Sequence, residues 1–159
     1  MTRSNPTPTL SLGHIGLNVT NLQNSLKFYS QTLGLEIYHV VDEPGQHFAF
    51  LGTGGQVRVT LWEQSEGRFD AARPGLHHLA FQVPSVADVA AFQARLKAAD
   101  AEMIYDRIVS HDEGASSGGI FFRDPDGNRL EIYVADGVHS HAPATAAAPS
   151  CGFFAPSTA

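Results

Sequence analysis

The 159-residue sequence contains a single cysteine, Cys151. One cysteine cannot form a disulfide within the chain, and it excludes zinc sites built from several thiolates. Long apolar runs are also missing, because none approaches the roughly 18 residues of a membrane-spanning helix. The opening MTRSNPTPTL lacks the apolar segment of a secretory signal. These absences predict a soluble, cytoplasmic protein with no membrane partner.

An excess of positive charge is absent as well. Lysine and arginine number 10 against 16 aspartates and glutamates, which gives a net charge of −6 and an isoelectric point near 5.7. Such a chain offers no basic surface to the phosphates of a nucleic acid or to an anionic membrane. The expected partner is therefore a small-molecule substrate. What the sequence has in number is histidine, with eight residues.

The chain contains one internal duplication. HIGLNV at residues 14–19 aligns without a gap with HLAFQV at residues 78–83, 64 residues later. Both segments alternate apolar and polar residues, which is typical of a strand. Each precedes a helix-capping residue, Asn21 or Ser85, and then a stretch with helical spacing. Further apolar stretches follow each helix, so each half predicts the order strand, helix, strand, strand, strand.

The predicted fold class is α+β, with two paired βαβββ modules forming a cupped, open mixed β-sheet around a cleft and helices outside. The second module should contain a helix to about residue 99, a strand near residues 102–108 and a Gly/Ser loop at residues 114–119. The loop of residues 112–119 is either a lid or a surface loop. The predicted parts are a flexible lead-in (1–11), the first module (12–67), a linker (68–75), the second module (76–136) and an Ala/Pro-rich tail (137–159), disordered or loosely docked.

The alternation assigns side chains to the two faces of each sheet. The apolar side of each first strand should be covered by the helix, so His14 and His78 should point into the cleft. The same parity places Glu131 of the last strand there. Each of the three alone could be structural, but two neutral imidazoles and one carboxylate together suit Fe(II) or Mn(II). The sequence therefore predicts a metal site formed by His14, His78 and Glu131.

Other residues have predicted places relative to that site. Thr60 aligns with Glu131 and should occupy the matching corner of the first module. Glu63 has the opposite parity, so we expect it at a solvated strand end, with a metal ligand as the alternative. His77 should face away from His78. The candidate substrate-binding residues, each with rim charge or ordinary packing as the alternative, are Arg58, Thr60, Trp62, Phe121, Arg129 and Tyr133.

These motifs resemble the vicinal-oxygen-chelate superfamily, which includes glyoxalase I, bleomycin- and fosfomycin-resistance proteins, methylmalonyl-CoA epimerase and type I extradiol dioxygenases. The resemblance covers residues 10–136. It is carried by HIGLNV, the NLxxSLxFY helix with LGLE, HLAFQV and FxxDPDGNxLE. It implies paired modules, often in dimers, so a homodimer is open. It also implies a divalent metal ion, with Fe2+ or Mn2+ favoured and Ni2+ or Zn2+ as alternatives.

Extradiol dioxygenases carry His, His and Glu at the positions of His14, His78 and Glu131, and a histidine and a tyrosine ahead of the Asp-Pro pair. His111 resembles the histidine that acts as acid or base, although a loop histidine without a role is the alternative. Phe121 stands where the tyrosine is expected, which puts ring cleavage in doubt.

The resemblance favours a metal-dependent, extradiol-dioxygenase-like oxidoreductase acting on a vicinal-oxygen substrate. Thr60 departs from the Glu or Gln of glyoxalase I and the epimerase. The alternatives are a lyase, isomerase or transferase of the glyoxalase or fosfomycin-resistance type, and a metal-free drug-binding protein.

Overall fold

The structure, a computed structural model, describes residues 9–145 and 148–153; the rest of the predicted lead-in and tail lies outside the described residues. The first half consists of β1 (Ile15–Val19), α1 (Leu22–Lys27), a π-helical turn (Phe28–Thr32), β2 (Glu36–Glu43), β3 (Gln46–Thr53) and β4 (Gln56–Glu63). The second half consists of β5 (Leu79–Gln82), α2 (Val86–Ala98), β6 (Val109–Ser110), β7 (Gly118–Arg123) and β8 (Arg129–Val134), followed by a short 3-10 turn (Ser150–Gly152). The two halves repeat one order of elements, as the duplication predicts.

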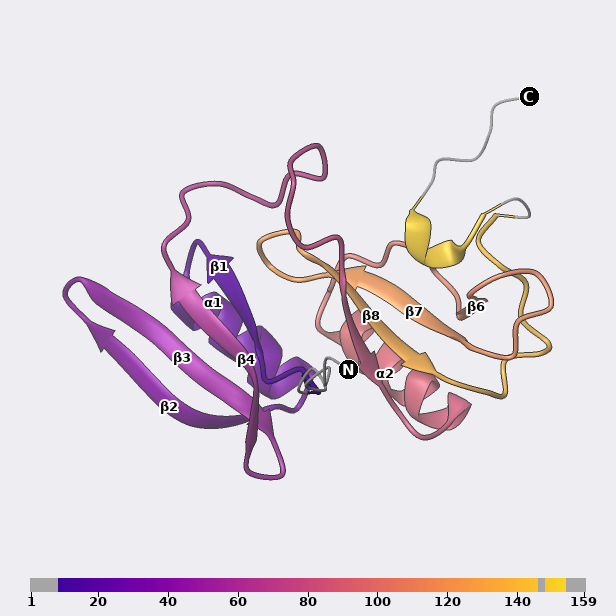
Figure 1. The fold of residues 1–159 in the computed structure, drawn as a ribbon, viewed down its shortest axis with the longest axis horizontal. Helices are drawn as coiled ribbons and strands as arrows, with labels where there is room; N and C mark the ends of the chain where they lie inside the picture. Colours follow the sequence, from indigo (N-terminus) through magenta and orange to yellow (C-terminus); the bar gives the residue numbers. More distant parts are fainter. Residues whose placement is uncertain (1–8, 146–147, 154–159) are drawn as a thin grey trace, which may run out of the picture.

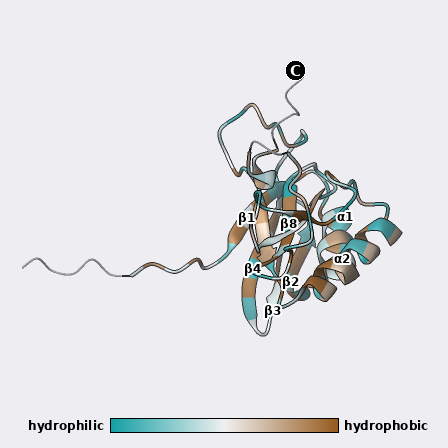
Figure 2. Cartoon of the chain, turned by 90° about the vertical axis from the view of Figure 1, so that its right-hand side faces the viewer, coloured by the Kyte–Doolittle hydropathy of each residue, from teal (hydrophilic) through white to brown (hydrophobic). Residues whose placement is uncertain are grey.

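Each half forms its own four-stranded mixed sheet, in the order β1-β4-β3-β2 or β5-β8-β7-β6. The first strand of each half pairs in parallel with the last, and the other pairings are antiparallel. The two sheets stand side by side, with both helices on the same side of them (Figures 1 and 2). The predicted α+β class is confirmed.

Local signals in the sequence start both helices. The Asn21 side chain accepts a hydrogen bond from the Asn24 amide at 2.8 Å. The Ser85 hydroxyl accepts one from the Asp88 amide at 3.2 Å and donates to the Asp88 carboxylate at 2.6 Å. Gly34, with φ of 78°, follows the π-helical turn. The Asn21 and Ser85 side chains thus satisfy amides that a helix leaves unpaired at its first turn.

The first strands have the faces that their alternation predicts. In β1, Leu17 and Val19 are buried beneath the helices, whereas Gly16 and Asn18 are exposed. Buried residues from both halves form one hydrophobic cluster. The two modules therefore share a core on the helix side of the sheets, and the opposite face carries polar and aromatic side chains.

One buried and one partly buried hydrogen bond join the two halves at the turn between β7 and β8. The Tyr29 hydroxyl donates to Oδ2 of Asp124 at 2.9 Å, and the Thr20 hydroxyl donates to the Asp126 carboxylate at 2.5 Å. Burial raises the pKa of Asp124, although hydrogen bonds from Asn128 and Tyr29 act in the opposite direction. Polar groups buried in this way must be paired, so the contact fixes one half against the other.

The strand expected near residues 102–108 is wrong. That segment makes one isolated bridge, between Met103 and Phe122, and regular pairing starts only at β6. The carbonyl of Asp106 instead accepts hydrogen bonds from the Gln93 and Lys97 side chains of α2, at 3.1 and 3.0 Å. These contacts hold Asp106 against the helix. The start of the segment stays at the sheet edge, because the Ile104 amide donates to the Phe121 carbonyl at 2.8 Å and the Glu102 carbonyl accepts from the Arg123 amide at 2.9 Å.

The predicted Gly/Ser loop ends two residues early, because Gly118 and Gly119 belong to β7. A Cβ atom on Gly118 would lie 2.2 Å from the carbonyl oxygen of Val109, and one on Gly119 would lie 2.0 Å from that of Ile132. Only glycine allows the backbones to approach this closely.

The expectation of a disordered or loosely docked tail is wrong for the described residues after 137. Val138 is fully buried, and its amide donates to the carbonyl of Ser116 at 3.0 Å. The Arg107 guanidinium donates to the carbonyls of Ala142 and Pro143 at 2.8 and 3.0 Å. An Ala/Pro-rich composition suggests disorder because it offers little apolar surface to bury. Here the second half of the chain supplies hydrogen-bond partners that hold the tail.

The outer edge of the first sheet is β2, which pairs only with β3 among the described strands. Ile37, Tyr38 and Val40 of this strand are exposed. The register with β3 shifts between Ile37 and His39, an irregularity of the β-bulge type.

Candidate active site

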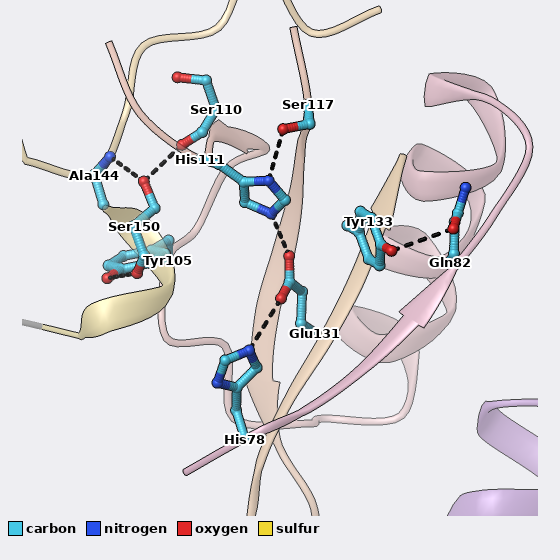
Figure 3. Close-up of polar contacts among 10 residues, drawn as sticks. All are labelled: His78, Gln82, Tyr105, Ser110, His111, Ser117, Glu131, Tyr133, Ala144 and Ser150. Carbon is cyan, nitrogen blue, oxygen red and sulfur yellow. Dashed lines mark hydrogen bonds and ion pairs between the residues drawn. The ribbon is translucent and has the colours of Figure 1, made fainter. Parts of the chain in front are cut away.

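Glu131 of β8 is the centre of a polar cluster on the face without helices (Figure 3). It is only 3% exposed. Its Oε1 lies 2.5 Å from Nε2 of His111, and its Oε2 lies 3.5 Å from Nε2 of His78. No lysine or arginine of the described residues forms an ion pair with it. A buried carboxylate is costly unless it is paired or binds a metal, so these two imidazoles are its compensation.

His111 follows β6 directly and is held from both sides. Its Nδ1 lies 2.8 Å from the hydroxyl oxygen of Ser117. Because an ionised carboxylate only accepts hydrogen bonds, Nε2 of His111 carries the proton and donates to Glu131. The Nδ1 of a neutral ring then accepts from the Ser117 hydroxyl. His111 therefore orients one oxygen of Glu131 and leaves the other facing His78.

His78 immediately precedes β5, and its neighbour His77 does not face away from it. The two Nδ1 atoms lie 2.8 Å apart. The expectation was wrong because the alternation of a strand begins only at Leu79. Burial lowers the pKa of His78, partly offset by the Glu131 carboxylate, which favours the neutral ring. When Nδ1–H donates to His77, the lone pair of Nε2 remains available on the side of Glu131.

The donor chemistry of His78 and Glu131 fits a divalent metal ion. Their facing atoms, at 3.5 Å, are farther apart than in an ordinary hydrogen bond, so both could ligate one ion. Neutral imidazole with carboxylate suits Fe(II) or Mn(II). Within residues 9–145 and 148–153, no three His, Cys, Asp or Glu side chains form a complete set for a metal. The structure thus brings together two of the three predicted ligands.

His14 lies apart from this pair. It is exposed, immediately before β1, and lines a pocket of about 560 Å³ together with Arg58 and residues of β5. In the described part of the chain, no hydrogen bond or ion pair joins it to His78 or Glu131. The cleft expected from parity therefore does not bring all three side chains together within one chain.

The predicted substrate-binding residues of the first half lie beside a row of aromatic rings, on the face of the first sheet that the helices do not cover. Thr60 is buried, and its hydroxyl accepts a hydrogen bond from the Trp62 indole at 3.0 Å. The Trp62 ring stacks on Phe48 with centroids 5.1 Å apart. Arg58 is exposed and donates to the Gln56 side chain at 2.5 Å. These residues belong to one surface of the first sheet, whereas Glu131 lies on the second.

The predicted second-half substrate residues do surround Glu131. Phe121 is fully buried with its ring centroid 6.4 Å from that of His111, and the Tyr133 ring lies 5.6 Å from His111. The Tyr133 hydroxyl donates to Gln82 at 3.2 Å. The Arg129 guanidinium lies over an aromatic ring of the tail, and its buried Nε has no hydrogen-bond partner among the described residues.

Sequence reasoning missed two tail residues beside the cluster. The Phe153 ring lies 5.9 Å from that of His78 and 5.6 Å from that of Phe121. Cys151 is partly buried, and burial together with the Glu131 carboxylate raises the pKa of its thiol, which keeps it protonated at neutral pH. The only signal was the CGFF run in an otherwise Ala/Pro-rich segment.

Glu63 has a structural contact that the sequence did not indicate. Its Oε2 accepts a hydrogen bond from the Leu22 amide at 2.6 Å, at the start of α1. A carboxylate is favourable there, because the first amides of a helix are unpaired and carry partial positive charge. The expectation of a solvated strand end was wrong.

Comparison with known protein families assigns the chain to one of them. A profile of the Glyoxalase/Bleomycin resistance protein/Dioxygenase superfamily matches residues 11–132. The chain belongs to this superfamily. Members commonly use divalent metals, bind small molecules and often form dimers. No described helix of this superfamily member is long and apolar enough to cross a membrane.

Three similar proteins show the range of the superfamily. The chain is 30% identical to a trivalent organoarsenical cleaving enzyme of Bacillus sp. (strain MD1) over 124 residues, which span 78% of this chain and 73% of that one. It is 27% identical to catechol-2,3-dioxygenase of Bacillus subtilis (strain 168) over 125 residues, 77% of this chain but only 41% of the relative. A crystal structure of a glyoxylase/bleomycin resistance protein/dioxygenase domain from Frankia sp. EAN1pec matches with a TM-score of 0.67 and 25% identity, over 80% of this chain and 98% of that one.

Proposed function

We propose that this chain is a metal-dependent, extradiol-dioxygenase-like enzyme that binds a small vicinal-oxygen substrate, such as a catecholate, at an ion held by His14, His78 and Glu131. The observation that carries the proposal is the buried Glu131 carboxylate, which lies between two imidazoles and has one oxygen left beside His78. Similarity to a catechol-2,3-dioxygenase supports the substrate class.

The residues around Glu131 have distinct roles in this proposal. A divalent metal, when bound, supplies Lewis acidity to the two oxygens of a chelating substrate. His111 holds Glu131 in place through Nε2–H, and the lone pair of its Nδ1, beside the Ser117 hydroxyl, can accept and return a proton. Arg129 offers a positive charge to an anionic substrate, and the rings of Phe121 and Tyr133 exclude water. Thr60, Trp62 and Arg58 lie on the first sheet, beside the strand that follows His14, so in this proposal they form the opposite wall wherever that sheet meets Glu131.

The third ligand, in this proposal, comes from a second copy of the chain. His14 makes no contact with His78 or Glu131 within one chain, and it lies exposed. Superfamily members often form dimers. His14 of the partner subunit would then complete the set that one chain provides in part.

Metal content decides the proposal. Elemental mass spectrometry on the purified full chain, after reconstitution with Fe2+, Mn2+, Ni2+ or Zn2+, should find about one ion per site, and Glu131→Gln should lose it. The exposed His139 and His141 form an H-x-H pair that could collect metal, so a His139→Asn/His141→Asn variant is the matched control and should keep the ion. A chain that binds none of the four metals, or a Glu131→Gln variant that keeps its metal, would refute the proposal.

The reaction is tested once metal binding is established. Oxygen consumption with catechols should be seen in the wild type and lost in Glu131→Gln. Absence of consumption in a metal-loaded protein would exclude the dioxygenase reaction and leave a lyase, isomerase or transferase.

A second candidate reaction is cleavage of a trivalent organoarsenical, favoured by the 30% identity to the Bacillus enzyme of that name. Trivalent arsenic binds thiols, and the chain has one, Cys151, beside the cluster. Release of inorganic arsenic from a trivalent organoarsenical, absent in Cys151→Ser, would support this reaction over ring cleavage.

A further inference from the structure

The described tail residues after 137 form a segment that we call the C-terminal strap (residues 138–145 and 148–153). Its contact with the cluster is centred on Ser150, which is 1% exposed. The Ser150 amide donates to the His111 carbonyl at 2.7 Å, and its hydroxyl donates to the Ser110 carbonyl at 2.6 Å. Its carbonyl accepts from the Tyr105 hydroxyl at 2.9 Å. The strap is therefore hydrogen-bonded to the same backbone that positions His111 (Figure 3).

This attachment places Phe153 over the cluster. Its ring centroid lies 5.4 Å from that of His77 and 5.9 Å from that of His78, and the Arg129 guanidinium lies 4.7 Å from it. The backbone of Phe153 has φ of 54°, a region that bulky residues seldom adopt. Such a conformation persists only where surrounding contacts determine it.

Phe153 nevertheless remains only half-buried. Its ring is not part of the hydrophobic cluster between sheets and helices. It contacts instead three kinds of group that the proposed function uses, namely a metal ligand (His78), a cationic side chain (Arg129) and a ring beside the acid/base (Phe121). An aromatic ring in this position limits the space above His78 and Glu131.

We propose that the C-terminal strap is a permanent wall of the active site, and that Phe153 is the residue that sets which ligands reach His78 and Glu131. This inference rests on the proposed function and adds a substrate class to it, namely flat aromatic ligands without a bulky group on the side of Phe153. The ring of Phe153 stacks on a flat aromatic ligand, and it blocks ligands with a bulky group on that side.

The first test measures whether the Phe153 ring lies beside His78, and it needs neither bound metal nor activity. In nuclear magnetic resonance spectra of the metal-free full chain, the ring protons of Phe153 should show cross-relaxation with the imidazole protons of His78. Phe153→Ala should shift those imidazole protons, because the ring current is lost, and Phe69→Ala is the matched control. Phe69 also lies beside Arg129, at 5.6 Å, but makes no ring contact with His78 among the described residues. Absence of the Phe153–His78 signal would overturn the proposal.

The second test measures selectivity on the metal-loaded full chain by calorimetry without oxygen. The probes are catechol and 4-tert-butylcatechol. Phe153→Ala should bind catechol about 5-fold more weakly, the worth of one aromatic contact, and should bind the bulky probe at least as well as the wild type. Phe153→Leu keeps bulk without a flat face, so it should still disfavour the bulky probe. Phe69→Ala should leave the ratio of the two affinities unchanged.

The outcomes separate the two proposals. A wild type without metal would refute the proposed function, while the metal-free spectra still decide whether the strap covers the cluster. An unchanged affinity ratio in Phe153→Ala would refute the role of Phe153 in selectivity. Tighter catechol binding in that variant would also refute it, because the ring would then be an obstacle in the substrate position and not its wall.

Discussion

Replacing Tyr29 with phenylalanine isolates the hydrogen bond that joins the two halves. The Tyr29 side chain is fully buried, and its hydroxyl donates to Asp124, itself 4% exposed, at 2.9 Å. Phenylalanine keeps the ring, so no large cavity is created. The variant therefore measures the loss of one buried donor to a carboxylate.

The magnitude follows from the remaining partners of Asp124. Its carboxylate also accepts hydrogen bonds from the amides of Asp126 and Asn128 and from the Asn128 side chain. Since these stay, the loss should match one hydrogen bond to a charged group, about 2 kcal/mol. For a chain of this size, that lowers the melting temperature by about 4–8 °C.

The deficit should depend on pH. Burial raises the folded-state pKa of Asp124, so the ionised carboxyl opposes folding at pH 7, and this cost is relieved as the pH falls through the raised pKa. Removing the Tyr29 donor raises that pKa further, because the ionised form loses a stabilising hydrogen bond. The difference between variant and wild type should therefore be largest near pH 7 and shrink toward about pH 4.

Urea unfolding of both proteins at several pH values measures this. The matched control is Tyr38→Phe, which also removes one hydroxyl but from an exposed side chain that accepts from Gly55. We expect its cost to stay below about 0.5 kcal/mol. A Tyr29→Phe deficit as small as that of the control, or one that grows on acidification, would refute the reasoning.

Three further predictions concern the site and its supports. Gly119→Ala should destabilise the chain by several kcal/mol, seen as a lower urea midpoint, because its Cβ would overlap the backbone of β8; Gly67→Ala, with open space around it, should cost little. Glu63→Gln should cost about 1 kcal/mol in the same assay, since the start of α1 loses a charged acceptor, and an unchanged midpoint would contradict this. His111→Gln should weaken metal binding about 10- to 100-fold in a titration, because the carboxylate loses its orienting partner. His47→Gln, at a half-buried histidine on the first sheet, should not weaken it.

The sequence was sufficient to predict the repeated architecture. The strands at residues 14–19 and 78–83 alternate strictly, and one face of such a strand must be covered, so the duplication and the periodicity gave the same order of elements. The polar face of β8 was predicted for the same reason. Where a residue lies inside a regular strand, parity alone assigns its side.

The errors lie where regular structure ends. His77 and His78 precede β5, and the alternation does not extend to them. Within residues 102–108, the Asp106 carbonyl is held by side chains of α2 that no local pattern reveals. The strap depends on contacts between Ser150 and the backbone about 40 residues earlier. Long-range hydrogen bonds of this kind leave no periodic signal in the sequence.

The exposed strand β2 bears on how this protein behaves in concentrated solution. A long outer strand with apolar side chains is a template onto which another extended chain can add. The register shift between Ile37 and His39 interrupts that template, and Glu36, Asp42 and Glu43 put negative charge at both ends of it. Two copies approaching edge to edge would therefore meet a bent backbone and like charges. Neutralising those acids should make the protein more prone to aggregate through this edge.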